Sequence, residues 1–325
     1  MAELTIRESL TKALKEALDN NDNVFLMGED IGMYGGPYAV TKGLLEEYGS
    51  EKIMDTPISE SGFVGAAIGA SMAGMKPIVE IMTINFSLLA IDQIVNHAAK
   101  IYYMSDGQLS VPIIVRTVTG AGGRLGATHS QSFEGWYASV PGLKVVCPSN
   151  AVDALGLFRA AINDNNPVIF VEHSMLYNVK NEVPDQYYET PIGLPKILEE
   201  GDDLTLIAWS GMIPLAKSIS SELNKNNINT EIIDLISLNP IDFELIFESV
   251  KKTNKVVILD EYWETGSFGS YISSVIQEKC FDYLDGPIGV INSLNIPMPY
   301  SAELEDQVIP NIDRSLVKIK ELFGF

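Results

Sequence analysis

Short apolar runs rich in β-branched residues recur along this chain, and segments with helical spacing separate them. In the first half, apolar runs cover residues 23–27, 77–84, 111–118, 143–147 and 167–172, and helix-like stretches cover 59–74, 86–104 and 150–163. Strands that alternate with helices in this way form mostly parallel sheets that are covered on both faces. The pattern therefore predicts a doubly wound α/β fold.

The same pattern starts again after a polar interruption. Residues 183–203 contain three prolines and little periodicity, which is typical of a linker. Beyond it, strand-like runs cover 204–209, 229–235 and 255–261, and helix-like stretches cover 213–224, 242–252 and 268–279. The sequence thus predicts two α/β domains, residues 1–182 and 204–325, joined by a linker, and 325 residues are enough for both.

Charge and cysteine content limit the possible partners. The formal net charge of −21 argues against nucleic acid or an anionic membrane surface, because both are bound through clustered Lys and Arg. The two cysteines, Cys147 and Cys280, lie far apart in apolar surroundings, so we expect no disulfide framework and a reducing compartment.

Glu60 stands directly before a run made almost entirely of small residues. Residues 61–75 read SGFVGAAIGASMAGM, a poor helix in isolation but one that allows another backbone to come close. Glu60 is then either a functional carboxylate at a dry seam or a surface residue that complements the helix N-terminus by roughly 0.3–1 kcal/mol. The run is too short to span a membrane and ends at Lys76-Pro77.

A glycine-rich loop, residues 120–126, precedes a histidine. Its sequence GAGGRLG either cradles an anion with backbone N–H groups or forms a mobile active-site loop. His129 follows in the segment THSQS, where an imidazole can act as acid, base or donor. Neither GxGxxG nor GxxxxGK[ST] occurs in the chain, so nucleotide binding through such loops is unsupported.

The segment AINDNN, residues 161–166, comes before Pro167. One interpretation is a helix C-cap followed by a turn. The other is a cation site, because exposed carbonyls and Asp164 would provide hard oxygen ligands.

Several longer motifs together resemble one family. They are LMGEDIGMYGGPYAVTKGL, DTPISESGFVGAAIGASMAG, TINFSLLAIDQIVNHAAK, HSQSFEGWYASVPGLKVV, AINDNNPVIFVEH and IPMPYSAELED. From about residue 3 to 320 the chain resembles the β subunits of the E1 components of 2-oxo acid dehydrogenase complexes, and it is most similar to the pyruvate branch. The resemblance implies a transketolase-like pyrimidine-binding domain for thiamin diphosphate followed by a transketolase C-terminal domain.

The resemblance also implies roles for four residues. Glu60 matches the glutamate that contacts N1′ of the aminopyrimidine and thereby activates the cofactor. Phe86 matches the aromatic residue that stacks on the pyrimidine, although an ordinary core aromatic is the alternative. Glu29 resembles an acidic residue implicated in proton communication between paired sites, and helix capping explains it nearly as well. His129 matches a loop histidine that assists protonation or reductive acylation.

The resemblance also implies two metal ions. A structural potassium site is implied at Ile113, Ala161, Ile162, Asp164 and Asn166. In the family, the diphosphate and Mg²⁺ are held by a GDG motif, which this chain lacks. Half of the cofactor site is therefore expected to come from an E1 α subunit.

The implied reaction is decarboxylation of a 2-oxo acid and transfer of the acyl group to lipoamide on an E2 dihydrolipoyl acetyltransferase. The expected assembly is an α₂β₂ heterotetramer. The alternatives are an E1 β subunit for acetoin or branched-chain substrates, and a non-catalytic scaffold subunit. Because no leader is visible, we expect a bacterial cytoplasmic protein, with the plastid stroma as second choice. Ile236 and Asn295 depart from the family pattern, where Arg and Asp are common.

Overall fold

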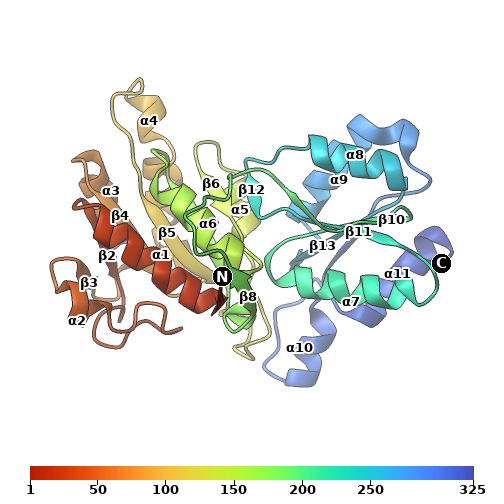
Figure 1. Cartoon of the computed structure of the whole chain (residues 1–325), viewed down its shortest axis with the longest axis horizontal. Coiled ribbons are helices and arrows are strands. Elements are labelled where there is room, and N and C mark those ends of the chain that lie inside the picture. The colour runs from red at the N-terminus through yellow and green to blue at the C-terminus, as the bar shows by residue number, and fades with distance from the viewer. The chain divides into compact units, whose positions relative to one another are not determined.

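The computed structural model describes residues 1–325, which fold into two compact units. Figure 1 shows a sheet flanked by helices in each unit. The N-terminal unit comprises Met1–Thr119, Trp136–Ile192 and Leu238–Pro240, and the C-terminal unit comprises Gly120–Gly135, Gly193–Ser237 and Ile241–Phe325. The predicted class, two mostly parallel α/β domains, is confirmed.

The N-terminal unit is built on a seven-stranded sheet. In spatial order its strands are β12 (Ser237–Asn239), β6 (Lys144–Val146), β7 (Val168–His173), β5 (Ile114–Thr119), β4 (Lys76–Ile81), β2 (Val24–Gly28) and β3 (Ile53–Asp55). The pairs from β6 through β3 are all parallel. Every residue of β5 and β7 is buried, as expected for central strands with both faces covered.

Helices cover this sheet and fix its connections. The helix α1 (Ile6–Asn20) begins at a capping box in which Thr5 and Glu8 bond each other's backbone N–H groups. It packs along α6 (Ala151–Ile162), as Figure 1 shows. The remaining elements are β1 (Ala2–Thr5) and β8 (Lys180–Val183), which pair antiparallel, with α2 (Leu44–Tyr48), α3 (Glu60–Met72), α5 (Glu134–Ala138) and η3 (Ser174–Leu176).

The helix-like stretch predicted over residues 86–104 is helical, but it is not one regular α-helix. The segment consists of a 3₁₀ helix, η1 (Phe86–Ala90), a π-helix, η2 (Gln93–Ala98), and a short α-helix, α4 (Ile101–Met104). Over five residues the side-chain spacings of 3₁₀, α and π turns are nearly the same, so the apolar pattern cannot separate them.

The C-terminal unit has a five-stranded sheet in the spatial order β14-β13-β10-β11-β9. Figure 1 shows α7 and α11 on one face and α8 and α9 on the other. Strands β10, β11, β13 and β14 are parallel. The bounds are β10 (Leu204–Ala208), β11 (Thr230–Asp234), β13 (Val256–Trp263), β14 (Gly289–Ser293), α7 (Ile213–Asn224), α8 (Glu244–Thr253), α9 (Phe268–Cys280), α10 (Ala302–Val308), α11 (Ile312–Phe323), η4 (Ser210–Met212) and η5 (Phe281–Tyr283).

The predicted linker is not structureless. It contains β9 (Lys196–Glu199), which pairs antiparallel with β11 at the edge of the C-terminal sheet. Charged residues at both ends of so short a strand are usual at a sheet edge, where they discourage pairing with other chains. The prolines and charged residues around β9 obscure its apolar pattern, so the sequence did not predict this strand.

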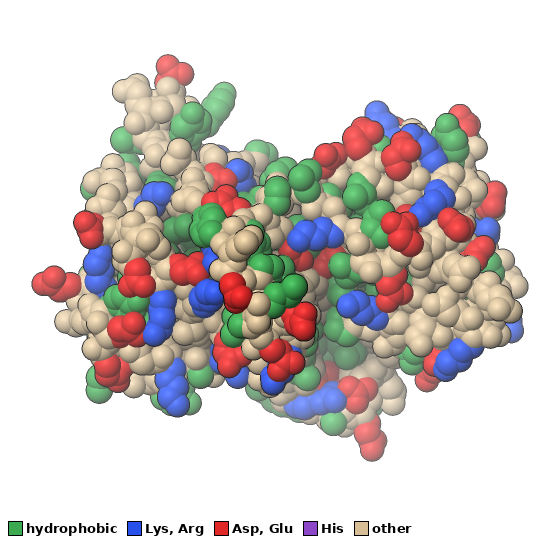
Figure 2. Space-filling model, viewed as in Figure 1, with side chains coloured by type: hydrophobic (Ala, Val, Ile, Leu, Met, Phe, Trp, Pro, Cys, Tyr) green, Lys and Arg blue, Asp and Glu red, His purple; other side chains and the backbone are tan.

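The surface is mixed in charge. Figure 2 shows acidic and basic side chains interspersed over the visible face. No helix of the structure combines the length and the apolarity needed to cross a membrane. Both cysteines, Cys147 and Cys280, are buried free thiols, as expected.

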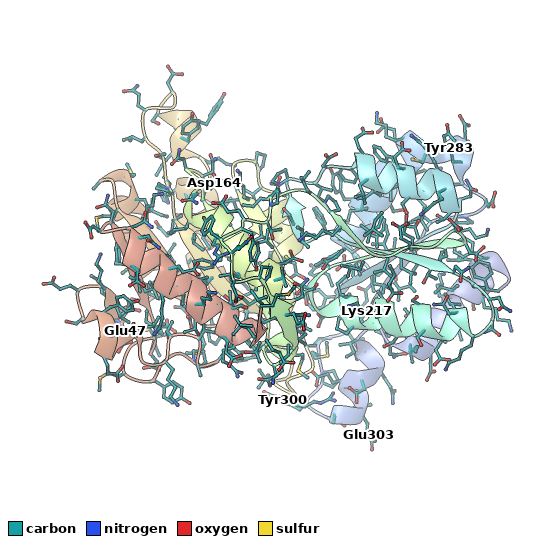
Figure 3. The ribbon with its side chains drawn as sticks, in the orientation of Figure 1. Glu47, Asp164, Lys217, Tyr283, Tyr300 and Glu303 are labelled. Carbon is teal, nitrogen blue, oxygen red and sulfur yellow. The ribbon has the colours of Figure 1, made fainter.

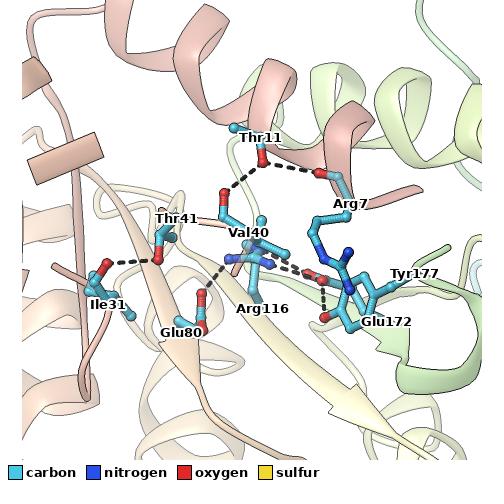
Figure 4. Close-up of polar contacts among 9 residues, drawn as sticks. All are labelled: Arg7, Thr11, Ile31, Val40, Thr41, Glu80, Arg116, Glu172 and Tyr177. Carbon is cyan, nitrogen blue, oxygen red and sulfur yellow. Dashed lines mark hydrogen bonds and ion pairs between the residues drawn. The ribbon is translucent and has the colours of Figure 1, made fainter. Parts of the chain in front are cut away.

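A buried ion cluster lies at the centre of the N-terminal sheet (Figure 4). Arg116 of β5 donates two bonds to Glu172 of β7, at 2.7 and 2.9 Å, and one to Glu80 of β4, at 2.5 Å. The Tyr177 hydroxyl donates to Glu172 at 2.6 Å. Burial raises the pKa of Glu80 despite the adjacent guanidinium. Two carboxylates thus share one arginine, which links side chains of β4, β5 and β7.

We expect Arg116→Met to lower the free energy of unfolding by about 3–5 kcal/mol, because it leaves two buried carboxylates without their cation. Urea titration of the variant measures this loss. Adding Glu80→Gln and Glu172→Gln should restore much of it if charge is the cause. Lys15→Met breaks only the exposed pair with Glu47 and should cost about 1 kcal/mol or less. An equally small loss for Arg116→Met would contradict this account.

Candidate functional site

The strand order of the N-terminal sheet indicates where a ligand would bind. After β2 the chain forms β3 on one side of it and then β4 on the other, so the order reverses between β2 and β4. In open parallel sheets, ligands bind outside the carboxyl ends of the strands at such a reversal. Glu29 directly follows β2, and the segment that ends in Phe86 follows β4. Topology alone therefore places these two residues at the expected site.

Glu60 joins them from the neighbouring strand. It is the first residue of α3, which follows β3, and only 3% of it is exposed. This burial does not fit a carboxylate that merely complements a helix end at the surface. The small residues of α3 permit the close packing: a side chain at Gly65 would meet the Gln93 amide oxygen at 2.9 Å. Helix α3 contacts β2, β4, η1 and η2, and so brings Glu60 towards the reversal point.

Glu29 and Glu60 influence each other electrostatically. The pKa of Glu29 is raised, first by burial and then by the charges of Glu60 and Asp30. Glu29 is 6% exposed, and its Oε1 atom is buried without a hydrogen-bond partner. A buried acceptor without a donor is costly, and a carboxyl can lower that cost by taking up a proton or by accepting from the N–H group of a ligand. Two adjacent buried carboxyls with no cation between them form a site suited to holding a proton.

Phe86 is half-buried at the start of η1. The residues before it are held tightly, because the Asn85 amide donates to the Thr83 hydroxyl at 2.6 Å and Thr83 donates to the Val118 carbonyl. Ser87, the next residue, contacts the Tyr137 hydroxyl at 2.5 Å. The ring therefore stands on a rigid turn, which suits an aromatic that stacks on a flat ligand.

His129 belongs to the other unit. It is exposed on the loop between β5 and α5, and its Nδ1 lies 2.8 Å from the Thr128 hydroxyl. The structure therefore brings Glu29, Glu60 and Phe86 together in the N-terminal unit and places His129 with the C-terminal unit.

The glycine-rich loop does bind anions, but they are carboxylates of the chain itself. The Ala121 N–H donates to Glu261 at 2.6 Å, and the Gly122 N–H donates to Glu305 at 2.9 Å. Arg124 pairs with Glu305 and Asp306, each at 2.8 Å. Neither glutamate was among the sequence-predicted site residues, because both lie more than a hundred positions further along the chain.

The oxygens of the residues implied for potassium carry hydrogen bonds within the chain. The Ile162 carbonyl accepts from Lys76 Nζ at 2.9 Å, and the Asp164 carboxylate pairs with Lys144. The other Asp164 oxygen accepts from the Asn166 backbone and side chain. The carbonyls of Ile113 and Ala161 accept from Val168 and Asp164. Two ammonium groups, those of Lys76 and Lys144, thus lie on oxygens of this segment. Figure 3 labels Asp164 on the N-terminal unit.

The structure contains no group of three or more His, Cys, Asp or Glu residues placed to hold a metal ion. Of the two departures from the family pattern, Ile236 is fully buried with a positive φ of 48°. Asn295 donates to the Thr265 hydroxyl at 3.1 Å.

Comparison with known families agrees with this architecture. Residues 2–180 match the family model described as "Transketolase, pyrimidine binding domain", and residues 193–314 match "Transketolase, C-terminal domain". A solved structure titled "Split gene transketolase, inactive beta4 tetramer" aligns over 99% of this chain and 98% of its own, with a TM-score of 0.79 and 21% identity. These matches define a two-domain transketolase-like protein.

Curated relatives narrow the class. The chain is 44% identical over 320 residues to the "Pyruvate dehydrogenase E1 component subunit beta" of Rickettsia felis, covering 98% of both chains. It is 46% identical to the mitochondrial beta-2 subunit of the same name from Oryza sativa, covering 96% of this chain and 84% of the other. The Rhizobium meliloti subunit is 45% identical over 98% of this chain and 70% of its own length. The chain belongs to the family of pyruvate dehydrogenase E1 component β subunits.

Glu29→Gln should stabilise the protein above pH 4.5, and the gain should grow with pH. A carboxyl with a raised folded-state pKa contributes stability at low pH that is lost as pH rises through the folded pKa. Glutamine removes that loss, so the difference in unfolding free energy between variant and wild type should increase from pH 4.5 upward and then level off. Urea titrations at several pH values measure it. A difference that does not change with pH would show that Glu29 titrates normally.

Proposed function

We propose that this chain provides the aminopyrimidine half of a thiamin diphosphate site in an E1 enzyme that oxidatively decarboxylates pyruvate and acetylates the lipoyl group of an E2 partner. The observation that carries the proposal is the buried pair of Glu60 and Glu29 at the carboxyl ends of parallel strands, with one Glu29 oxygen lacking a donor.

The residues present fit the cofactor's aminopyrimidine. When bound, thiamin diphosphate supplies the carbon that adds to the 2-oxo acid carbonyl and accepts the electron pair released with CO₂. Glu60 would share a proton between its carboxyl oxygen and N1′ of the pyrimidine, and a buried site strengthens that bond. Phe86 would support the flat ring by stacking. Glu29 would tune the charge at Glu60 and pass a proton between paired sites.

His129 is proposed to act later, when the lipoyl group arrives. An exposed imidazole on a loop can donate or accept a proton at the transferred group without being part of the cofactor's pocket.

The partners follow from what the chain lacks. With neither the diphosphate motif nor a cluster of metal-ligating side chains, it needs an α subunit to hold the diphosphate and Mg²⁺. We propose an α₂β₂ heterotetramer that delivers acetyl groups to dihydrolipoyl acetyltransferase. The relatives' name, pyruvate dehydrogenase E1 component subunit beta, supports this choice over acetoin or branched-chain substrates.

In a complex co-expressed with its α partner, Glu60→Gln should lower kcat for pyruvate by roughly 10²–10⁴-fold, because glutamine cannot share the proton. The assay follows pyruvate decarboxylation with thiamin diphosphate, Mg²⁺ and an artificial electron acceptor. Glu46→Gln, an exposed position on α2, is the matched control and should retain wild-type activity.

Unchanged activity in Glu60→Gln would remove Glu60 from the mechanism and favour a scaffold role. If the wild-type complex is inactive on pyruvate but active on acetoin or a branched-chain 2-oxo acid, the substrate assignment is wrong and the chemistry stands. Activity of the β chain alone would contradict the shared site.

For potassium we propose competition with Lys76. If the ion binds the Ile162 carbonyl, it must displace the Lys76 ammonium from it. Lys76→Met should therefore increase the stabilisation by KCl relative to NaCl at equal ionic strength, measured as the difference in Tm. Lys52→Met, which removes an ammonium from other carbonyls, is the control. The same potassium dependence in Lys76→Met and wild type would show that ion and lysine do not share a position.

A further inference from the structure

The loop that carries His129 is tied down at its first residues by two buried carboxylates. Glu305 is fully buried on α10, and Glu261 is 8% exposed near the end of β13. Each accepts a bond from a backbone N–H of the loop, at 2.9 and 2.6 Å. Hydrogen bonds to an ionised acceptor are roughly twice as strong as neutral ones, so these two bonds are unusually firm for a loop.

Arg124 closes this arrangement from the solvent side. Its Nη1 donates to Glu305 and to the Ala302 carbonyl, and its Nη2 pairs with Asp306. Arg124 has a φ of +60°, which costs energy for a residue with a side chain. The ion pairs to α10 offset that cost.

A contact with Tyr300 adds a steric restraint. Gly126 has a φ of +77°, and a Cβ there would lie 2.5 Å from the Tyr300 ring. Figure 3 labels Tyr300 beside α10, with Glu303 on the same segment further from the loop. The positive φ favours glycine here, three residues before His129, and a larger residue would also have to displace the Tyr300 ring.

The far end of the loop is anchored as well. The Phe133 and Trp263 rings meet edge to face at 6.4 Å, and Trp209 donates to the Glu134 carboxylate at 3.5 Å. A side chain at Gly135 would touch Phe268 at 3.0 Å. His129 therefore lies on a loop that is held at both ends, and His129 itself is exposed.

We infer that Glu261 and Glu305 are positioning residues that hold this loop so that His129 presents its imidazole in one place to the arriving lipoyl group. This rests on the proposed function. A loop that only needed to cover the surface would not require two buried carboxylates. The fully buried Glu305 accepts from this loop twice, from the Gly122 N–H and from Arg124. The arrangement shifts the cost of ordering the loop from the moment of acyl transfer to folding.

The test is a double-mutant cycle in the α₂β₂ complex. Glu305→Gln should lower kcat for reductive acetylation of lipoamide at least about tenfold, with little change in KM for pyruvate. In a His129→Ala background the same substitution should change that kcat less than about twofold, because the group it positions is gone. Glu303→Gln, exposed on the same helix, is the matched control.

A second readout does not depend on activity. Trypsin cleavage after Arg124, followed by mass spectrometry, should become several-fold faster in Glu305→Gln and remain at the wild-type rate in Glu303→Gln. Equal losses of kcat in both His129 backgrounds would overturn positioning and leave only a structural role. Unchanged cleavage together with unchanged kcat would show that the carboxylate does not hold the loop. A wild-type complex without activity would refute the proposed function, whereas the cleavage result would still test the loop contact.

Discussion

Burying a carboxylate is the costly step on which this structure depends, and three groups of buried acids meet that cost differently. Glu80 and Glu172 share the Arg116 guanidinium inside the N-terminal sheet. Glu261 and Glu305 accept backbone N–H groups of a loop. Glu29, beside Glu60, is left with an oxygen that has no donor at all. The first arrangement links neighbouring strands, the second holds a loop, and the third leaves a group able to take up a proton.

Asp260 shows that hydrogen-bond donors and burial have opposite effects on the pKa of a buried carboxyl. It is fully buried beside Glu261 and accepts N–H bonds from Gly269 and Tyr262, which favour its charged form. Burial outweighs those bonds and raises its pKa to about 6. Backbone donors therefore do not fully compensate a buried carboxylate here. One Glu29 oxygen has no hydrogen-bond donor at all. Burial therefore favours the neutral form of Glu29 for the same reason as in Asp260.

The sequence predicted the parts of the site that depend on local pattern. Glu60 before a Gly/Ala run marks the start of α3, and strands with continuous apolar residues mark the central sheet. The contacts of residues 121 and 122 with Glu261 and Glu305 span 140 and 183 positions, and no local pattern encodes them. The glycine-rich loop correctly indicated backbone donors for an anion, while the identity of the anion depended on the folded chain. In the same way, Lys76 meets the Ile162 carbonyl only because β4 and α6 come together in space.

In the proposed function, this arrangement of acids suits a chain that supplies one part of a shared site. A pair of neighbouring buried carboxyls raises the energy of the isolated chain, since neither has a cation and one lacks a donor. A ligand that brings a ring nitrogen and a proton to Glu29 and Glu60 would supply the hydrogen bonds that these carboxyls lack in the isolated chain. Binding energy is then directed at the reacting end of the ligand and not spread over the surface. In the proposed function, the diphosphate end is left to the partner subunit, so this chain can dedicate its buried acids to proton chemistry.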